Sequence, residues 1–312
     1  MKINIKQMLS NSEQIKKADL LYDERYASIY NQIWCEKNHW KPLSDFYEKI
    51  LNSLLQSSKN WLDVGCGTGY LLSKFSEVDR SGMDLSDDML HIARSANPNA
   101  TFYKQSMTEK RPELEGKFDL VTCTGQPYCY LPTMGDIELA IARLAEWTAK
   151  DGKCMVAPSD LVDIMDIEFP HDLYDLSGLP LSRGVTTLGV VWTSKEHDGA
   201  YYYQLCPHLD QLVRWFGDHF RKIEILLRPK SEEGTTRVLR RVIVASEKRD
   251  IGDDTPPTII LPSEPLFDVR KNTEEAQSPV SELSNKDLLK ELAKRLKSGS
   301  LVKAAVKKIV SG

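Results

Sequence analysis

The sequence predicts an α/β fold built on a doubly wound, mostly parallel sheet of seven strands, and three observations support this prediction. Short apolar runs with the character of strands alternate with helical segments over the first half of the chain. A glycine-rich turn follows the first of these runs. The length of 312 residues, with 41% hydrophobic and 28% charged residues, is ample for a buried core and typical of a globular protein.

Residues 1–57 are expected to form a helical lid. Apolar and aromatic side chains recur near the helical period in two stretches, one from Leu20 to Trp34 and one from Phe46 to Leu55. The second stretch ends just before the first predicted strand. The sequence therefore predicts helices that lead directly into the core.

The core is expected to span residues 58–248, and its first part alternates strands with helices. Predicted strands cover 60–64, 81–85, 100–104, 118–123 and 153–157. Predicted helices begin at Gly69, Asp87 and Asp136. Because parallel strands need crossover connections, this alternation predicts helices on both faces of the sheet.

An insertion at about 159–205, on the expected substrate side, interrupts the alternation with acids, prolines and aromatic residues. Its second half predicts two antiparallel strands, at 185–194 and 200–205. A helix and the last two strands of the sheet are expected after it, at 209–216, 223–227 and 238–245.

The C-terminal part is expected to be a proline-rich linker, 249–281, followed by a basic amphipathic helical tail, 282–312. The tail has eight Lys/Arg against three Asp/Glu, and its leucines recur at helical spacing. Such a helix is suited to contact a protein partner or an anionic membrane surface, and a solvated helix is an equally good interpretation.

Composition excludes several classes of protein. The net charge of 41 − 45 = −4 argues against a polycation that binds nucleic acid. No apolar run approaches the roughly 20 residues of a membrane helix, and no apolar segment typical of a secretory signal follows Met1. The six cysteines are scattered without a CxxC pair, so neither a metal site nor a disulfide framework is predicted. We expect a cytoplasmic protein of undetermined oligomeric state.

The strongest chemical signal is the run from Asp63 to Gly69, with glycines at 65, 67 and 69. Glycines at this place let the backbone turn tightly and approach a ligand closely. Asp84 ends the next predicted strand, where a carboxylate can accept both hydroxyls of a ribose. The glycines follow a GxGxG pattern and not the GxGxxG pattern of dinucleotide-binding proteins. Asp63 would repel a pyrophosphate and could hold an ammonium group.

These features resemble motif I of class I S-adenosylmethionine-dependent methyltransferases, whose fold is Rossmann-like. Residues 83–90 resemble the second motif of the family, 118–123 its fourth strand, and 151–153 the turn before its fifth strand. The resemblance covers roughly residues 58–160, and the last two predicted strands suit the reversed hairpin that closes the sheet of this family. It implies an enzyme with S-adenosyl-L-methionine as its cofactor.

The resemblance also implies roles for individual residues. The methionine part of the cofactor is expected near Asp63, Gly65, Cys66, Gly67 and Gly69, its ribose at Asp84, and its adenine against Leu85 and Met89. Ser106 and Met107 after the third strand and Thr124 after the fourth complete the expected contacts. Where the family usually has an acid that binds the adenine amine, this chain has Gln105 or Ser106. Core packing is an equally good interpretation of Leu85 and Met89.

The loop after the fourth strand, 124–131, resembles that of glycine N-methyltransferase and of amino-sugar N,N-dimethyltransferases. The run Tyr22-Asp23-Glu24-Arg25-Tyr26 likewise resembles the tyrosine-bearing lid helix of this small-molecule branch. In-line methyl transfer needs mainly alignment, desolvation and a free lone pair on the acceptor. A hydroxyl acceptor also needs a general base, for which His171 and His208 are candidates, and Tyr128 could orient the acceptor.

An amine acceptor must be neutral to attack, and a nearby carboxylate or desolvation alone can achieve this. The insertion offers several acids: Asp160, Asp163, Asp166 and Asp172. Surface or structural roles are the simpler interpretation of each histidine and acid. The sequence thus favours methyl transfer to N or O of a small metabolite or sugar, with no nucleic-acid partner. The alternatives are an NAD- or nucleotide-sugar-dependent oxidoreductase, which the glycine spacing and Asp63 disfavour, and a non-catalytic methyltransferase-like module that binds partners.

Overall fold

The computed structural model describes residues 22–36, 40–159, 182–185, 189–195, 201–228 and 241–263. The chain divides into two compact units, 1–266 and 267–312, and all described residues belong to the first. The predicted tail, 282–312, lies outside the described residues. Among the described residues, no helix is long and apolar enough to cross a membrane.

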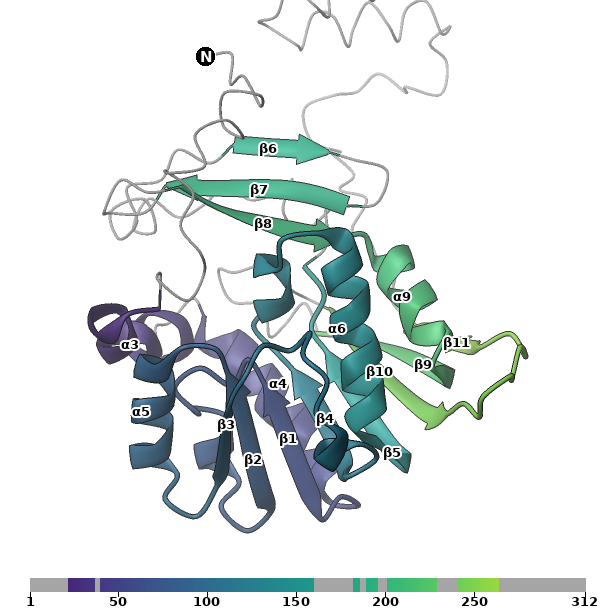
Figure 1. The fold of residues 1–312 in the computed structure, drawn as a ribbon, viewed down its shortest axis with the longest axis horizontal. Coiled ribbons are helices and arrows are strands. Elements are labelled where there is room, and N and C mark those ends of the chain that lie inside the picture. Colours follow the sequence, from purple (N-terminus) through teal and green to yellow (C-terminus); the bar gives the residue numbers. More distant parts are fainter. Residues whose placement is uncertain are drawn as a thin grey trace, which may run out of the picture. The chain divides into compact units, whose positions relative to one another are not determined.

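A mostly parallel sheet forms the centre of the first unit (Figure 1). Its strands are β1 (Asn60–Val64), β2 (Asp79–Asp84), β3 (Thr101–Lys104), β4 (Phe118–Cys123), β5 (Thr148–Val156), β9 (Phe220–Leu227), β10 (Arg241–Lys248) and β11 (Thr258–Ile260). Their order is β11-β9-β10-β5-β4-β1-β2-β3. β10 is antiparallel to both β5 and β9, and all other neighbours are parallel. The carboxyl ends of β1, β2, β4, β5 and β9 therefore meet at one edge.

The sheet has eight strands, one more than the sequence predicts. The additional strand, β11, lies within the segment 249–281 that was predicted to be a linker, and it pairs in parallel with β9 at the edge of the sheet. Its three residues are all exposed. A strand this short, with no buried face, produces no alternation of polar and apolar residues, so its sequence does not reveal it.

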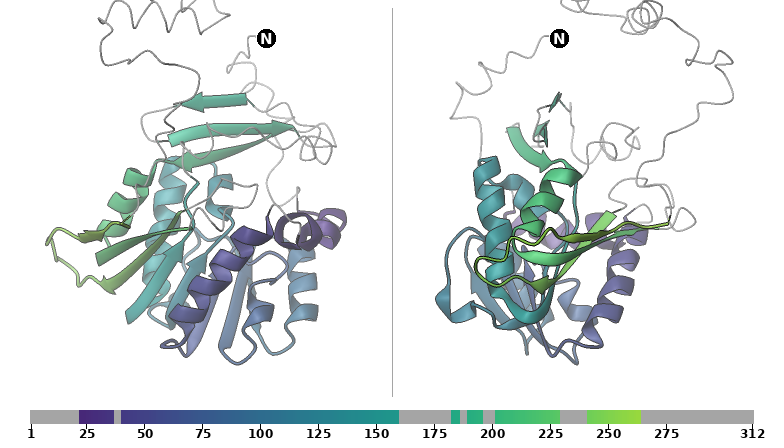
Figure 2. Two further views of the ribbon diagram at one scale, coloured as in Figure 1. Left: turned by 180° about the vertical axis from the view of Figure 1, so that it is seen from behind. Right: turned by 90° about the vertical axis from the view of Figure 1, so that its right-hand side faces the viewer.

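Helices cover both faces of the sheet, as predicted. Helix α6 (Met134–Trp147) and helix α9 (Leu209–Gly217) pack on the face that contains Leu62 and Val121. Helix α4 (Lys41–Leu55) packs on the opposite face, against Trp61 and Met155, as seen from behind in Figure 2. Alternation along each strand sends neighbouring side chains to opposite faces, and this accounts for the two separate apolar cores.

One predicted helix is absent. The sequence predicts a helix starting at Gly69, but this stretch contains a single 3-10 turn, η2 (Leu72–Lys74). Gly69 has a φ of +68° and belongs to the preceding turn, and the buried Arg80 of β2 donates a hydrogen bond of 2.6 Å to the Leu72 carbonyl. That contact holds the 3-10 turn against β2, which begins at Asp79, so few residues are left after Gly69 for a longer helix. The other crossover helix near this edge, α5 (Asp87–Ala96), forms as expected.

The predicted N-terminal helix is present, and the insertion contains the two predicted strands and one more, β6. Helix α3 (Glu24–Asn31) continues into a short π-helical segment, η1 (Gln32–Glu36). A second sheet has the order β6-β7-β8, and its strands are antiparallel. They are β6 (Ser182–Val185), β7 (Gly189–Lys195) and β8 (Tyr201–Pro207).

Candidate functional site

A turn of three glycines lies at the carboxyl end of β1. Gly65, Gly67 and Gly69 have φ values of +70°, +52° and +68°, a region that side chains rarely adopt. A Cβ atom on Gly65 would lie 2.2 Å from Cγ of Pro127, so this position also requires glycine for close packing. Beside Gly67, in contrast, the nearest atom to such a Cβ belongs to Tyr30, at 4.0 Å. The backbone of Gly67 is thus open to a ligand that lies beneath Tyr30.

Asp84 stands at the tip of β2, beside this turn. Its Oδ2 accepts a hydrogen bond of 2.8 Å from the Gly67 N–H, and its Oδ1 accepts one of 3.0 Å from the Ser86 N–H. Burial raises the pKa of Asp84, and the backbone N–H groups that it accepts from act against this rise. A carboxylate has about four acceptor positions, so Asp84 keeps capacity for two more donors, such as the two hydroxyls of a ribose.

Asp63 lies below the turn, on β1, and is 3% exposed. Its Oδ1 accepts a hydrogen bond of 2.6 Å from the Thr122 hydroxyl, which itself accepts one of 2.8 Å from Nε1 of Trp61. Burial raises the pKa of Asp63 to about 7, the Thr122 hydrogen bond opposes the rise, and the charge of Asp84 adds to it. A cation bound at this carboxylate would lower its pKa again. Asp63 is therefore suited to an ammonium group.

Helix α3 and the residues beside it cover this edge of the sheet. The Thr68 hydroxyl donates a hydrogen bond of 2.5 Å to Oδ1 of Asn31, and the Ser86 hydroxyl donates one of 2.6 Å to the Tyr22 carbonyl. These two bonds connect the helical segment to the glycine turn and to the start of α5. The predicted lid is thus attached above the carboxyl ends of β1 and β2.

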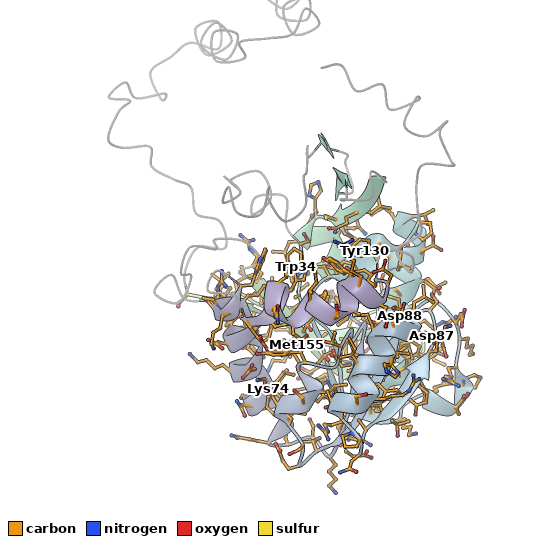
Figure 3. The ribbon with its side chains drawn as sticks, turned by 90° about the vertical axis from the view of Figure 1, so that its left-hand side faces the viewer. Trp34, Lys74, Asp87, Asp88, Tyr130 and Met155 are labelled. Carbon is orange, nitrogen blue, oxygen red and sulfur yellow. The ribbon has the colours of Figure 1, made fainter. Side chains whose placement is uncertain are left out.

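Four tyrosines form an aromatic cluster: Tyr22 precedes α3, Tyr26 and Tyr30 belong to α3, and Tyr130 comes from the loop after β4. The ring of Tyr22 lies 5.5 Å from that of Tyr26, 6.1 Å from Tyr30 and 5.8 Å from Tyr130, all edge to face. Figure 3 shows Tyr130 next to helix α3. Burial raises the pKa of Tyr22 and of Tyr30, so both phenols are neutral.

The other predicted cofactor residues divide into accessible and buried groups. Leu85 is 47% exposed beside Asp84, as a surface that packs on adenine would be, whereas Met89 is 1% exposed and belongs to the core. Ser106 is partly exposed and its hydroxyl is 2.9 Å from that of Thr108. Met107 packs against the core near α6, and both Thr124 and Cys66 are 9% exposed.

The predicted catalytic residues are less well placed. The Tyr128 side chain is 0% exposed, and its hydroxyl donates a hydrogen bond of 3.0 Å to the Ala157 carbonyl. This tyrosine therefore stabilises the loop after β4 and does not face an acceptor. His208 is partly exposed at the start of α9, where its carbonyl accepts the first hydrogen bonds of the helix. His171 lies outside the described residues, as do the acids at 160–172.

Sequence reasoning missed two residues of this site, Tyr130 and Thr122. The hydroxyl of Tyr130 accepts a hydrogen bond of 2.7 Å from Nε2 of Gln204, a residue of β8. Thr122 was also missed as the hydroxyl that binds Asp63. Alternation on β4 could have revealed Thr122 as a polar residue within an apolar strand, but nothing in the sequence links Tyr130 to Gln204, which lies 74 residues further along the chain.

The geometry of these residues fits S-adenosyl-L-methionine. The backbone of Gly67 is open, Asp84 has unused acceptor positions, Leu85 offers an exposed apolar surface, and Asp63 is a buried carboxylate without a cationic partner among the described salt bridges. An acid at the tip of the second strand occurs in dinucleotide sites too, but Asp63 would repel a pyrophosphate at the glycine turn, so the site fits a sulfonium cofactor better than a dinucleotide.

Comparison with known proteins agrees with this assignment. Residues 62–152 match a family model described as a methyltransferase domain. An amino-sugar methyltransferase of Streptomyces venezuelae, the dTDP-3-amino-3,4,6-trideoxy-alpha-D-glucopyranose N,N-dimethyltransferase, is 31% identical over 142 residues, 44% of this chain and 59% of the relative. A related N,N-dimethyltransferase of Streptomyces fradiae is 36% identical over 101 residues, 31% of this chain and 38% of the relative. The matches thus span less than two thirds of either relative.

Solved structures show the same fold. A protein of Pyrococcus horikoshii aligns with 70% of this chain and 97% of its own, at a TM-score of 0.52 and 15% identity. An S-adenosylmethionine-dependent methyltransferase of Thermotoga maritima aligns with 74% of this chain and 100% of its own, at a TM-score of 0.50 and 16% identity. The predicted α/β, Rossmann-like fold is confirmed, and residues 62–152 resemble a methyltransferase domain, as the sequence predicts.

Proposed function

We propose that this chain, whose residues 62–152 match a model described as a methyltransferase domain, transfers a methyl group from S-adenosyl-L-methionine to a nitrogen atom of a small metabolite or sugar. The observation that carries the proposal is the pairing of the Asp84 carboxylate with the Gly67 N–H at the mouth of the glycine turn. The remaining acceptor positions of Asp84 would then be available to the ribose that the motif implies.

When bound, the cofactor supplies an activated methyl group on a positively charged sulfur, so the protein needs to align the reactants and exclude water. Asp84 binds the ribose hydroxyls, and Asp63 binds the ammonium of the methionine part. The tyrosine cluster at α3 shields the reacting centre from water. Tyr130 lies at the boundary between this cluster and β8 and is positioned to contact the acceptor.

An amine is the acceptor that we favour. The relatives from Streptomyces venezuelae and Streptomyces fradiae are named as N,N-dimethyltransferases of amino sugars linked to dTDP. An amine also needs no strong general base, because removal from water favours its neutral form. The described residues around the glycine turn accordingly include aromatic rings and no histidine.

Calorimetric titration tests the proposal. S-adenosylhomocysteine should bind the purified protein, and NAD should not. Binding of NAD alone would favour an oxidoreductase and contradict the proposal. Turnover is then measured with a panel of amino sugars, both free and nucleotide-linked, and a protein cut after residue 263 should retain this activity. Loss of turnover only in the shortened protein would favour a role for the basic tail. The six cysteines are all free and buried, which supports the cytoplasmic location that we propose.

A further inference from the structure

Three side chains with buried polar atoms lie at the active edge of the sheet, beside the cofactor crevice. Tyr47, in the middle of α4, is 5% exposed, and Arg228, directly after β9, is 0% exposed. Gln126, in the loop after β4, has a left-handed φ of 56°, which is uncommon for a residue with a side chain. The catalytic arrangement described above uses none of these three residues.

The fold brings the three side chains to one face. Leu226 of β9 packs with the apolar cluster that contains Tyr47, and alternation puts Arg228 on the same side of the sheet as Leu226. β9 runs parallel to β5, so Arg228 stands at the edge where the glycine turn lies. Gln126 reaches this edge from β4 and precedes Pro127, whose ring contacts Gly65.

Two polar atoms of this group, on Tyr47 and Gln126, point to a missing acceptor of hydrogen bonds. Within the part of the chain that the structure describes, neither the Tyr47 hydroxyl nor Nε2 of Gln126 has a hydrogen-bond partner, although both atoms are buried. Burial raises the pKa of Tyr47, and the Arg228 charge and the Gln126 side chain oppose this rise. Leaving such donors unpaired in the interior is unfavourable, and an oxyanion would accept hydrogen bonds from them.

We propose that Tyr47, Gln126 and Arg228 bind an oxyanion carried by the methyl acceptor, either a carboxylate or a phosphate. This inference rests on the proposed function, because the acceptor is defined by it. The sheet order separates β9 from β1 by β10, β5 and β4. At about 4.8 Å per strand, the Arg228 backbone is roughly 19 Å from the strand that leads into the glycine turn. Arg228 therefore lies on the β9 side of the glycine turn, where we place the acceptor.

The variant Tyr47→Phe tests this site with little risk to folding. It removes only a hydroxyl that has no hydrogen-bond partner in the described structure, so the melting temperature should stay the same or rise. The matched control is Tyr103→Phe on β3, at the opposite edge of the sheet. The protein is first saturated with S-adenosylhomocysteine, and the probes are inorganic phosphate, pyrophosphate and acetate. The readout is the probe concentration that gives half of the maximal rise in melting temperature.

We expect at least one probe to stabilise the wild-type protein, and its affinity should fall roughly ten- to hundred-fold in Tyr47→Phe and stay unchanged in Tyr103→Phe. Preference for acetate indicates a carboxylate, and preference for phosphate or pyrophosphate indicates a phosphorylated acceptor. Equal binding to wild type and Tyr47→Phe, or no binding to either, would overturn the inference.

Two further outcomes separate this inference from the proposed function. If Tyr47→Phe weakens S-adenosylhomocysteine but not 5′-methylthioadenosine, the group holds the carboxylate of the cofactor, and the assignment to the acceptor is wrong. If S-adenosylhomocysteine fails to bind the wild-type protein, the proposed function itself is wrong. The anion titration is then repeated without S-adenosylhomocysteine. Weaker anion binding by Tyr47→Phe than by the wild type would then support the oxyanion site, but not its assignment to a methyl acceptor.

Discussion

Replacing Asp63 with asparagine should stabilise the protein above neutral pH. Burial raises the pKa of this carboxyl from 3.8 to about 7, because the charged form is poorly solvated in the interior. At 1.36 kcal/mol per pKa unit, this rise corresponds to roughly 4 kcal/mol. The native state holds the proton more tightly than the unfolded state does, so this group makes the protein less stable as the pH rises from about 4 to about 7. An amide does not ionise and lacks this dependence.

The measurement is the free energy of unfolding of wild type and Asp63→Asn by denaturant at several pH values from 5 to 8. The free energy of unfolding of Asp63→Asn should exceed that of the wild type by an amount that grows by about 1.4 kcal/mol per pH unit up to pH 7 and then levels off. The total gain over this range should be roughly 3 kcal/mol. The exposed Asp79, replaced in the same way, is the control and should show no such trend. A difference between Asp63→Asn and wild type that stays constant from pH 5 to 8 would refute the reasoning.

The same variant should bind S-adenosylhomocysteine more weakly, since a neutral amide does not attract an ammonium group. In the wild type, affinity for this ligand should fall as the pH drops below about 7, because the Asp63 carboxylate becomes protonated. Titration calorimetry at pH 6 and pH 8 checks both expectations. A gain in stability joined to a loss of binding would show that this carboxylate is retained for the ligand.

Three other predictions concern the ribose site, the glycine turn and the lid. Asp84→Ala should weaken S-adenosylhomocysteine binding by about 1–3 kcal/mol, the scale of lost charge-assisted hydrogen bonds, and unchanged affinity would show that the ribose assignment is wrong. Gly65→Ala should destabilise the protein by about 2–5 kcal/mol in denaturant unfolding, because it combines a φ of +70° with a steric clash. Gly116→Ala, with a φ of +61° and open space, should cost only about 1–2 kcal/mol, and equal losses would contradict this account. Asn31→Ala removes the hydrogen bond to Thr68, worth about 1 kcal/mol, so amide exchange in α3 should speed up about five-fold, and unchanged exchange would contradict the attachment of the lid.

Much of the fold was predictable because periodicity and turn chemistry act locally. The apolar run at 60–64 and the glycines after it mark β1 and its turn, and the stripe from Phe46 to Leu55 marks the buried side of α4. Each of these signals lies within a window of about fifteen residues, the range over which a pattern reports on structure. The position of Asp84 followed in the same way, from the end of a strand.

The features that the sequence did not reveal depend on contacts between distant segments. Thr122 meets Asp63 across 59 residues, and no local pattern predicts this pair. Arg228 follows the end of a strand, where an arginine is usually exposed, yet it is fully buried. Tyr128 was expected to orient the acceptor because it follows a strand at the active edge, but its ring turns into the core. Packing decides which way a loop side chain points, and packing between distant segments cannot be inferred from a local sequence pattern.

The short strand β11 has a consequence for where the domain can be cut. A protein truncated after Lys248, at the predicted end of the core, would leave β9 as the outermost strand of the sheet, with a row of unpaired backbone N–H and C=O groups. Exposed edge strands pair with strands of other molecules. The truncated protein should therefore form oligomers or precipitate at concentrations where a protein ending at residue 263 remains monomeric in solution. The three residues of β11, which lie beyond the predicted end of the core, thus cover the edge of the sheet and prevent it from pairing with other molecules.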